Sequence, residues 1–435
     1  MASFFIPLTG LESDSTALNT IANDLSNMNT TGFKAQTTDF SDLFYQQIGS
    51  TGAGDPIQVG AGVQVASNEI SFTQGSINST GNSTDVALNG SGFFVLNNGG
   101  NFEYSRAGNF SLNANGNLVS SNGLNIMGYP AVNGVVNTNA PLTAINIPVG
   151  TVQDPAATTT MSMTANLDSA TAAGTQFPAQ LTVYDSLGEP HVATVTYTPT
   201  ANANVWDYSV SLPAADYSTA GNNAVPAATT GTMQFDANGN LTTVTPTGGA
   251  AETVGTAAGD VSSIALNFNP AATNLLADGA TGLSINWNLL SASGTPTISQ
   301  VDTASAVSAT SQNGYTSGQY QSFAIGSDGT VTVSYSNGQQ QNVGQLALAN
   351  VSNLQGLSLL GDGDYVTTRA SGTAVVGTSG AAGLGTVQDD ALEASNVNIS
   401  TEFSDLIIAQ RAFEANAKSV TTFDTVTQDT INMVH

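Results

Sequence analysis

The feature that most constrains this chain is the periodicity of its final segment, residues 392–435. Apolar residues recur there every three or four positions, which is typical of an α-helix with one apolar face. Several of them are seven apart, so the stripe has the pattern of a coiled-coil seam and requires a partner helix. Ser400 is the predicted N-cap of this helix. The residues of the stripe that we predict to make subunit contacts are Ile399, Phe403, Leu406, Phe413, Val420, Phe423 and Ile431.

The first 33 residues carry a second stripe with the same period. Its predicted contact residues are Phe4, Leu8, Leu11, Leu18, Ile21, Leu25 and Met28. Ser3 is its candidate cap, Pro7 lies in the first turns, and Gly32 suits a left-handed position after the helix. We expect the two terminal helices to pack on each other. Since such a slender pair buries little surface, we also expect contacts with neighbouring copies.

The chain between the helices has short alternating runs bounded by turn residues, a pattern that predicts antiparallel hairpins. One such hairpin is predicted around residues 93–100 and another around residues 181–197. The predicted fold is mainly β with terminal α-helices, in which a coiled-coil-like helical layer accompanies nested, discontinuous antiparallel β-domains. The predicted parts are a helical assembly domain (1–33 with 390–435), a helical or extended connector (34–71 with 365–389), an inner β-domain (72–159 with 293–364) and an inserted outer β-domain (160–292).

Charge excludes several classes of partner. The net charge is −26, from 31 acidic and only 5 basic residues, so nucleic acid and anionic lipid would repel the chain. No apolar run is long enough for a membrane span, and we expect no membrane insertion. The first basic residue is Lys34, so the N-terminus lacks the basic region of a cleaved signal peptide, and export would need a dedicated route. The absence of cysteine excludes disulfides and thiolate metal sites.

The motifs that suggest chemistry have simpler structural explanations. Asp236 to Asn240 resembles the start of a calcium loop, but Thr247 stands where a closing acid is needed, and a hairpin turn is favoured. His191 and His435 are the only histidines, and we interpret both as isolated polar surface residues. No carboxylate pair stands out among the 31 acids. We therefore predict no catalytic, cofactor-binding or metal-binding residues, and an enzyme is the less favoured hypothesis.

Several blocks, in the same order, resemble those of the bacterial flagellar axial proteins, the family of rod and hook subunits. The first helix contributes Asn23, Asn27, Gly32 and Phe33. The body contributes residues 85–94, 104–110 and 128–130, and the end contributes Leu392, Glu393, Ser395, Asn396, Gln410 and Arg411. The resemblance covers roughly 130 residues at either end. Within the family, the inserted domain at 160–292 favours a hook subunit over the shorter rod subunits.

This resemblance implies a structural subunit exported unfolded through the flagellar type III apparatus, without signal cleavage, to the extracellular hook of the basal body. It implies a flexible curved tube that transmits motor torque from rod to filament. The implied partners are copies of the chain itself, the distal rod, the hook cap and the hook–filament junction proteins; no cofactor is implied. The alternatives are a distal rod or hook-associated axial protein, and less favourably an extracellular β-rich enzyme or glycan-binding module.

Overall fold

The computed structural model describes residues 5–50, 55–217, 225–269 and 276–433, which fall into two compact units. The first unit comprises residues 1–149, 321–334 and 340–435, and the second comprises residues 150–320 and 335–339. Both helices belong to the first unit. The second unit is an insertion between strands of the first.

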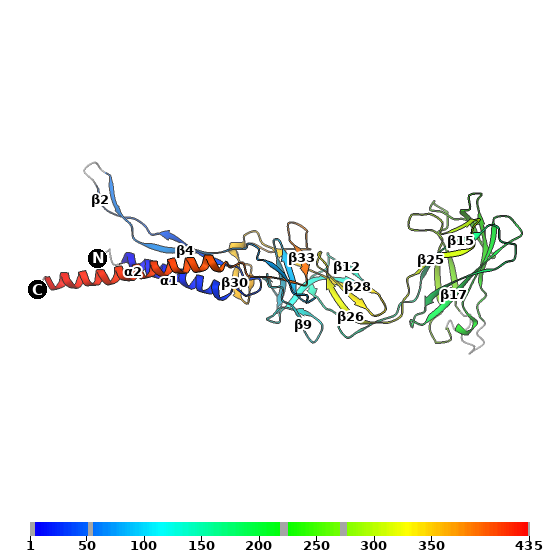
Figure 1. Cartoon of the computed structure of the whole chain (residues 1–435), viewed down its shortest axis with the longest axis horizontal. Coiled ribbons are helices and arrows are strands. Elements are labelled where there is room, and N and C mark those ends of the chain that lie inside the picture. Colours follow the sequence, from blue (N-terminus) through cyan, green and yellow to red (C-terminus); the bar gives the residue numbers. More distant parts are fainter. Residues whose placement is uncertain (1–4, 51–54, 218–224, 270–275, 434–435) are drawn as a thin grey trace. The chain divides into compact units, whose positions relative to one another are not determined.

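The predicted pairing of the terminal helices is confirmed. Helix α1 (Phe5–Ser26) and helix α2 (Ile399–Met433) lie side by side (Figure 1). Helix α1 ends earlier than predicted, so Met28 lies in the following turn, while Gly32 has the expected positive φ of 69°. The predicted contact Phe4 and cap Ser3 lie outside the described residues. No helix in the described ranges combines the length and apolarity needed to cross a membrane.

The predicted N-cap of the second helix is wrong by two residues. The side-chain Oδ1 of Asn398 accepts hydrogen bonds from the backbone N–H groups of Ser400 (3.0 Å) and Thr401 (3.3 Å). These are the bonds that an N-cap residue makes to the second and third residues of a helix. Asn398 therefore caps α2, and Ser400 lies inside its first turn.

The segment after α1 is extended, which settles the predicted choice between helix and strand. Strand β1 (Gln36–Asp42) pairs with β4 (Val63–Ile70), and β2 (Gln46–Ser50) pairs with β3 (Pro56–Val59). Strands β1 and β4 both contact α1. Phe44, between β1 and β2, is 93% exposed. The connector thus places large apolar side chains in solvent.

The remaining strands of the first unit form one large sheet and two short pairs. The central order is β27-β28-β11-β7-β8-β31-β30, and its core includes Phe93, Tyr104 and Tyr365. Its elements are β7 (Phe93–Asn98), β8 (Asn101–Ser105), β9 (Ser111–Leu112), β10 (Leu118–Val119), β11 (Asn125–Val132), β12 (Val135–Val136), β13 (Thr143–Ala144), β26 (Gly318–Ile325), β27 (Thr330–Tyr335), β28 (Gln340–Leu346), β29 (Leu348–Asn350), η3 (Leu354–Gly356), β30 (Ser358–Gly361), β31 (Asp364–Val366) and β32 (Val375–Gly377).

The two short pairs join the ends of the unit. Strand β5 (Ile77–Ser79) pairs with β34 (Ala391–Glu393), and β6 (Val86–Asn89) pairs with β33 (Thr386–Asp389). Because β32 pairs with β29 and β33 with β6, residues 375–389 belong to the inner β-structure. They do not continue the extended connector, as the predicted range 365–389 assumed.

The second unit is built from two sheets around one apolar core. Strands β16 to β21 form one sheet in sequence order, and the other has the order β22-β23-β15-β24 with β25 also paired to β15. The elements are β15 (Thr160–Asp168), β16 (Phe177–Tyr184), β17 (Pro190–Pro199), β18 (Val205–Ser211), η1 (Ala214–Asp216), β19 (Thr229–Phe235), β20 (Leu241–Pro246), β21 (Glu252–Thr253), β22 (Ser263–Phe268), β23 (Leu283–Asn288), β24 (Ile298–Val301) and β25 (Ala306–Gln312). Strand β14 (Val152–Gln153) lies outside these two sheets and pairs with β26.

Two details of this unit differ from the prediction. The unit is wider than residues 160–292, because β24 and β25 pair with β15 and so join the second unit. Strand β15 also pairs in parallel with β23 and β24, so the pairing is not antiparallel throughout. Parallel strands are joined by long connections and not by tight turns. Turn residues in the sequence therefore do not reveal which strands pair in parallel.

The sequence predicts the environment of Asp236 correctly and that of His191 incorrectly. Oδ1 of Asp236 accepts from the backbone N–H groups of Asn238 and Asn240, both at 2.8 Å, and Gly239 has a φ of 82°. The hairpin turn predicted at this position, in preference to a calcium loop, is confirmed. His191, in contrast, is only 6% exposed, so its predicted surface position is wrong.

The core of the second unit contains one poorly satisfied hydroxyl. Tyr208 packs edge-on against Trp287 with ring centroids 5.9 Å apart, and its Oη makes no hydrogen bond within the described ranges. Burial, with a smaller contribution from the charge of Glu252, raises the pKa of Tyr208 to about 12. The hydroxyl therefore carries a desolvation cost without a compensating bond.

We predict that Tyr208→Phe leaves the stability of the second unit unchanged or increases it by up to about 1 kcal/mol, because it removes an unsatisfied buried hydroxyl. Leu266→Ala, in the same core, should cost about 2–5 kcal/mol. Urea unfolding followed by tryptophan fluorescence measures both, since the only tryptophans, Trp206 and Trp287, lie in this unit. A loss above about 1 kcal/mol for Tyr208→Phe would contradict the absence of a partner.

Candidate assembly site

The contact between the two helices is made by small and polar side chains. The buried residues of α1 recur every three or four positions and are Pro7, Gly10, Ser13, Ala17, Thr20 and Asp24. A Cβ atom at Gly10 would lie 2.6 Å from Nδ2 of Asn416, so glycine permits the close approach of α2 at this point. Asn416 Nδ2 also donates to Oδ2 of Asp14 at 2.8 Å. The helices therefore touch at small and polar residues, while Thr20 and Asp24 of the same buried face are hydrogen-bonded to β1.

The predicted contact residues of α1 lie beside this face and not on it. Leu8 is exposed, as is Met28 in the turn beyond the helix. Leu11, Leu18, Ile21 and Leu25 are half-buried. The apolar stripe of α1 is thus not the most buried face of the helix.

The predicted stripe of α2 is more exposed than that of α1. Leu406 and Val420 are half-buried, whereas the exposed members are Ile399, Phe403, Phe413, Phe423 and Ile431. No residue of α2 is buried over the range that the structure describes, and every residue from 421 to 433 is exposed. The assignment of these side chains to subunit contacts remains a prediction, for which the structure supplies an unpartnered apolar surface.

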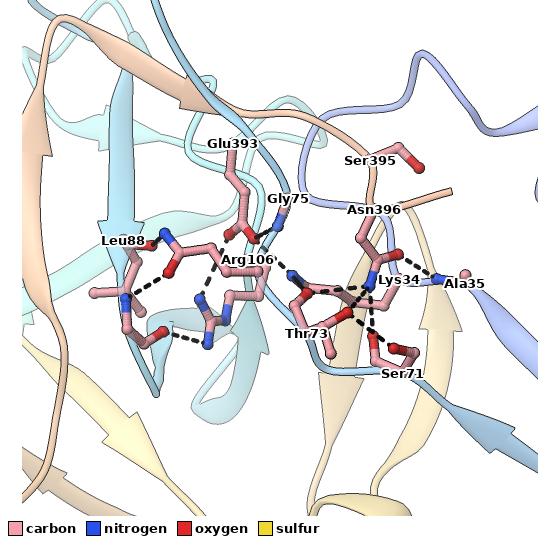
Figure 2. A network of polar contacts seen from close by, with 12 residues as sticks. Lys34, Ala35, Ser71, Thr73, Gly75, Leu88, Arg106, Glu393, Ser395 and Asn396 are labelled. Carbon is pink, nitrogen blue, oxygen red and sulfur yellow. Dashed lines mark hydrogen bonds and ion pairs between the residues drawn. The ribbon is translucent and has the colours of Figure 1, made fainter. Parts of the chain in front are cut away.

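A buried carboxylate lies where the helices join the β-structure. Figure 2 shows Glu393, at the end of β34, surrounded by groups from three other segments. Its Oε1 lies 2.6 Å from Nζ of Lys34 and accepts from the backbone N–H of Gly75 at 2.9 Å, and its Oε2 lies 3.4 Å from Nη1 of Arg106. The side chains of Lys34 and Glu393 are both fully inaccessible, and that of Arg106 is 5% exposed. We call these three residues the junction.

The two cations of the junction have further partners that compensate for their burial. Lys34 Nζ donates to the carbonyl of Thr73 at 2.8 Å, and Arg106 Nη2 donates to the carbonyl of Gly90 at 2.8 Å. Burial lowers the pKa of both cations, and the carboxylate of Glu393 opposes that shift in each. A buried ion pair needs such additional hydrogen bonds, because desolvation can otherwise exceed the Coulomb attraction.

Asn396 forms a second link, three residues after Glu393. Its Oδ1 accepts from the backbone N–H of Ala35 at 2.7 Å, and its Nδ2 donates to the carbonyls of Ser71 (2.8 Å) and Thr73 (3.0 Å), as Figure 2 shows. One amide therefore joins the chain after α1, the chain after β4 and the chain that enters α2. These contacts fix the approach of both helices to the β-structure.

Three of the other family-motif residues, Asn23, Asn27 and Gly32, also make hydrogen bonds in the described ranges. The backbone N–H of Gly32 donates to the carbonyl of Glu393 at 2.8 Å, and its positive φ places it against the backbone of Arg106. Asn27 Nδ2 donates to the carbonyl of Asn23 at 2.9 Å at the end of α1. The remaining motif residues are Phe33, Leu392 and Ser395, which are half-buried, and Gln410 and Arg411, which are exposed.

Asp24 of α1 is fully buried, and no sequence pattern predicts its position. Its Oδ2 accepts from the backbone N–H of Gln36 at 2.7 Å, and its Oδ1 has no hydrogen-bond partner within the described ranges. Burial raises the pKa of Asp24 to about 6. Burial, and then the charge of Asp24, also raises the pKa of Glu402 on α2. Two acidic groups thus meet where the helices pack.

Known families match the chain in four consecutive stretches. Residues 8–34 match "Flagella basal body rod protein", residues 87–165 match "Flagellar hook protein FlgE/F/G D1 domain", residues 151–315 match "Flagellar basal body protein FlaE D2 domain", and residues 388–433 match "Flagellar basal body rod FlgEFG protein C-terminal". The terminal matches contain nearly all of α1 and the whole of α2. The junction residue Glu393 lies within the last of them.

Relatives that align over the full length of the chain are also flagellar proteins. The flagellar hook protein FlgE of Treponema pallidum is 34% identical and aligns with 100% of this chain and 99% of its own length. That of Salmonella typhimurium is 34% identical over 99% of this chain and 100% of its own length. The crystal structure of Helicobacter pylori flagellar hook protein FlgE2 matches 73% of this chain and 100% of that chain with a TM-score of 0.52. At 13% identity, this last match shows a shared fold alone.

We predict that Glu393→Ala destabilises the first unit by about 3–5 kcal/mol, because it leaves Lys34 and Arg106 buried without their counter-charge. Glu414→Ala, which removes an exposed pair with Arg411, should have little effect. Urea unfolding followed by far-UV circular dichroism reports on the whole chain, whereas tryptophan fluorescence reports on the second unit alone. An unchanged dichroism transition in Glu393→Ala would contradict the role of the junction.

A second prediction concerns pH. Burial raises the folded-state pKa of Asp24 to about 6, above the 3.8 that is ordinary for an aspartate, so the folded state binds more protons between these values and loses stability as the pH rises through them. Asp24→Asn keeps an oxygen for the Gln36 N–H and removes the charge. It should stabilise the helix pair at pH 7 and flatten the dependence of the melting temperature between pH 4 and 6, as measured by dichroism at 222 nm. The matched substitution Glu12→Gln, at an exposed position of α1, should leave that slope unchanged.

Proposed function

Since this chain belongs to the flagellar hook protein family, we propose that its terminal helices form the contacts that join neighbouring copies within the hook. The chain is a structural subunit of the flagellar hook and not an enzyme. The distal-rod, hook-associated and glycan-binding alternatives are not favoured, because the relatives that match over the full length are hook proteins. Self-polymerisation and a location in the hook follow from the family.

The observation that carries the proposal is the apolar surface that the helices leave uncovered. Ile407 and Ile408 of α2 are 57% and 66% exposed, and residues 421–433 have no cover within the described ranges. A helix with a continuous apolar face that a soluble chain leaves exposed marks an interaction surface. Copies of the same helix pair offer the complementary face, as in other helical polymers.

A groove beside the helix pair supports the same surface. It lies between α1, β1 and α2, has a volume of about 300 Å³, and includes Ile21, Phe40 and Ile408 in its lining. Its lining is mixed and also includes Asp14, Glu402 and Asp405. The apolar part suits side chains from a neighbouring copy, since burying one large apolar side chain contributes about 1.5–3 kcal/mol. The exposed Phe44 and Ile48 of the connector add apolar surface close in sequence to this groove.

The finer parts of the proposal rest on the family resemblance. They are a flexible curved tube that transmits torque, contacts with the distal rod, the hook cap and the hook–filament junction proteins, and export through the flagellar type III apparatus without signal cleavage. The polar composition of the second unit supports flexible outer contacts, because exposed hydroxyl and amide groups exchange hydrogen bonds with water at little net cost. The apolar helices would then supply the lasting contacts.

The structure indicates where the chain should be cut to test this surface. Deletion from residue 393 would remove the carboxylate of the junction and unfold more than the helix, so deletion of residues 398–435 is the sharper change. We predict a protein that retains the β-structure by dichroism but forms no polymer by light scattering and negative-stain microscopy. Tubes formed by this deletion would contradict the proposed surface.

A double substitution supplies the matched comparison. Ile407→Ser with Ile408→Ser removes two exposed apolar side chains from α2 and should slow or abolish polymerisation without changing the unfolding transition. Val132→Ser with Val135→Ser removes a similar pair, 63% and 71% exposed, from the β11–β12 turn of the first unit. This control should polymerise as the unaltered chain does.

A further inference from the structure

The second unit holds a cluster of titratable side chains that the assembly function does not use. His191, at the start of β17, is buried, and its Nε2 lies 3.1 Å from Oδ2 of Asp185. Its Nδ1 lies 3.0 Å from Oδ2 of Asp216, at the end of η1. The side chain of Asp185 is fully inaccessible to solvent. Both nitrogens of one buried imidazole therefore face carboxylates.

A third carboxylate approaches from another part of the chain. Asp278 is exposed and lies in the segment that precedes β23. One ligand atom from each of Asp185, His191 and Asp278 can be chosen so that all three lie within 4.8 Å of one another. The segment of Asp278 is held in place by a hydrogen bond from the backbone N–H of Ala277 to the carbonyl of Asp216, at 2.9 Å. The cluster is closed by Asp185 on one side and open to solvent at Asp278.

The two outer carboxylates are oriented by the backbone. Oδ1 of Asp185 accepts from the N–H groups of Leu187 (2.8 Å) and Glu189 (2.9 Å), and Oδ1 of Asp278 accepts from the N–H of Ala280 (3.0 Å). In each carboxylate, one oxygen is engaged by its own turn and the second is left to face the cluster. The second oxygens and the imidazole thus converge without a basic residue among them in the described ranges.

We propose that Asp185, His191 and Asp278 form a binding site for a divalent transition-metal ion of the Zn²⁺ class. One imidazole and two carboxylates suit Zn²⁺, whereas Ca²⁺ and Mg²⁺ prefer oxygen ligands alone. Ligands about 2.0–2.2 Å from a tetrahedral ion are about 3.3 Å apart, close to the separation of His191 Nε2 and Asp185 Oδ2. Water would complete the coordination on the open side.

Asp216 is a positioning residue in this site. A ligating histidine usually presents its other ring nitrogen to a carboxylate, which fixes the orientation of the ring and aims the free nitrogen at the ion. Oδ2 of Asp216 is buried, lies beside Nδ1 of His191, and has no other partner within the described ranges. It therefore occupies the place of that supporting carboxylate.

A bound ion would connect parts of the unit that are far apart in sequence. Asp185 and His191 flank the β16–β17 turn, and Asp278 lies beyond η1 and strands β18 to β22. Because the unfolded chain does not bring these ligands together, binding would stabilise the folded second unit in proportion to the logarithm of the free ion concentration.

The test uses the full-length chain with His435→Asn, which leaves His191 as its only histidine. We expect Zn²⁺ to bind with one-to-one stoichiometry by calorimetry and to raise the melting temperature measured by tryptophan fluorescence. Co²⁺ should give the intense visible absorption of a tetrahedral site. Asp278→Asn keeps the turn bond to Ala280 and should weaken binding of Zn²⁺ at least tenfold, and His191→Gln should abolish the Co²⁺ spectrum.

The control is Asp236→Asn, in an exposed turn of the same unit where the aspartate makes the same backbone bonds but has no histidine beside it. It should bind Zn²⁺ as the parent does. No saturable binding to the parent, or equal affinity in Asp278→Asn, would overturn the proposal. If His191→Gln does not fold, the affinity of Asp278→Asn for Zn²⁺ tests the proposal by itself. This variant should fold, because the side chain of Asp278 is exposed. Polymerisation is not part of the readout, so this outcome is independent of the proposed assembly surface.

Discussion

The burial of Glu393 is the interaction on which the first unit depends. The chain has 31 acidic and only 5 basic residues, and two of those five cations lie against this one carboxylate. Three charged groups that have lost their hydration must satisfy one another, and the bonds from Gly75 and to Thr73 and Gly90 complete that satisfaction. Because Lys34 follows α1 and Glu393 precedes α2, the same contacts hold the chain just after α1 ends and just before α2 begins.

The helix pair buries little of its own apolar surface, which suits a polymer subunit. Its own interface includes Gly10 and Asp14, which lie against Asn416 and bury little apolar area. The larger apolar side chains of both helices are half-buried or exposed, and every residue of α2 from 421 to 433 is exposed. The pairing of α1 with α2 therefore orders the helices while leaving most of their hydrophobic surface for other copies.

The local patterns predicted the elements better than their faces or their distant pairings. Both helices and the main hairpins follow from periodicity and turn residues, which act over a few positions. The inward face of α1 escaped prediction because Gly10, Ser13 and Thr20 carry no hydrophobic signal. The strand pairs of β15 and the partners of His191 join segments separated by other strands, and no short-range pattern encodes such contacts. The motif residues Glu393 and Asn396 were found by resemblance, and their roles required the structure.

The junction has a consequence for the order in which the chain becomes available to fold. Lys34 and Glu393 are 359 positions apart, and Arg106 and Glu393 are 287 apart. A chain that emerges from its N-terminus presents both cations long before their shared anion, and a chain that stops early never presents it. The inner β-structure can be completed only when the last tenth of the polypeptide has arrived. A copy that lacks Glu393 therefore keeps two cations without their counter-charge, and it lacks the ion pairs that join the two ends of the chain.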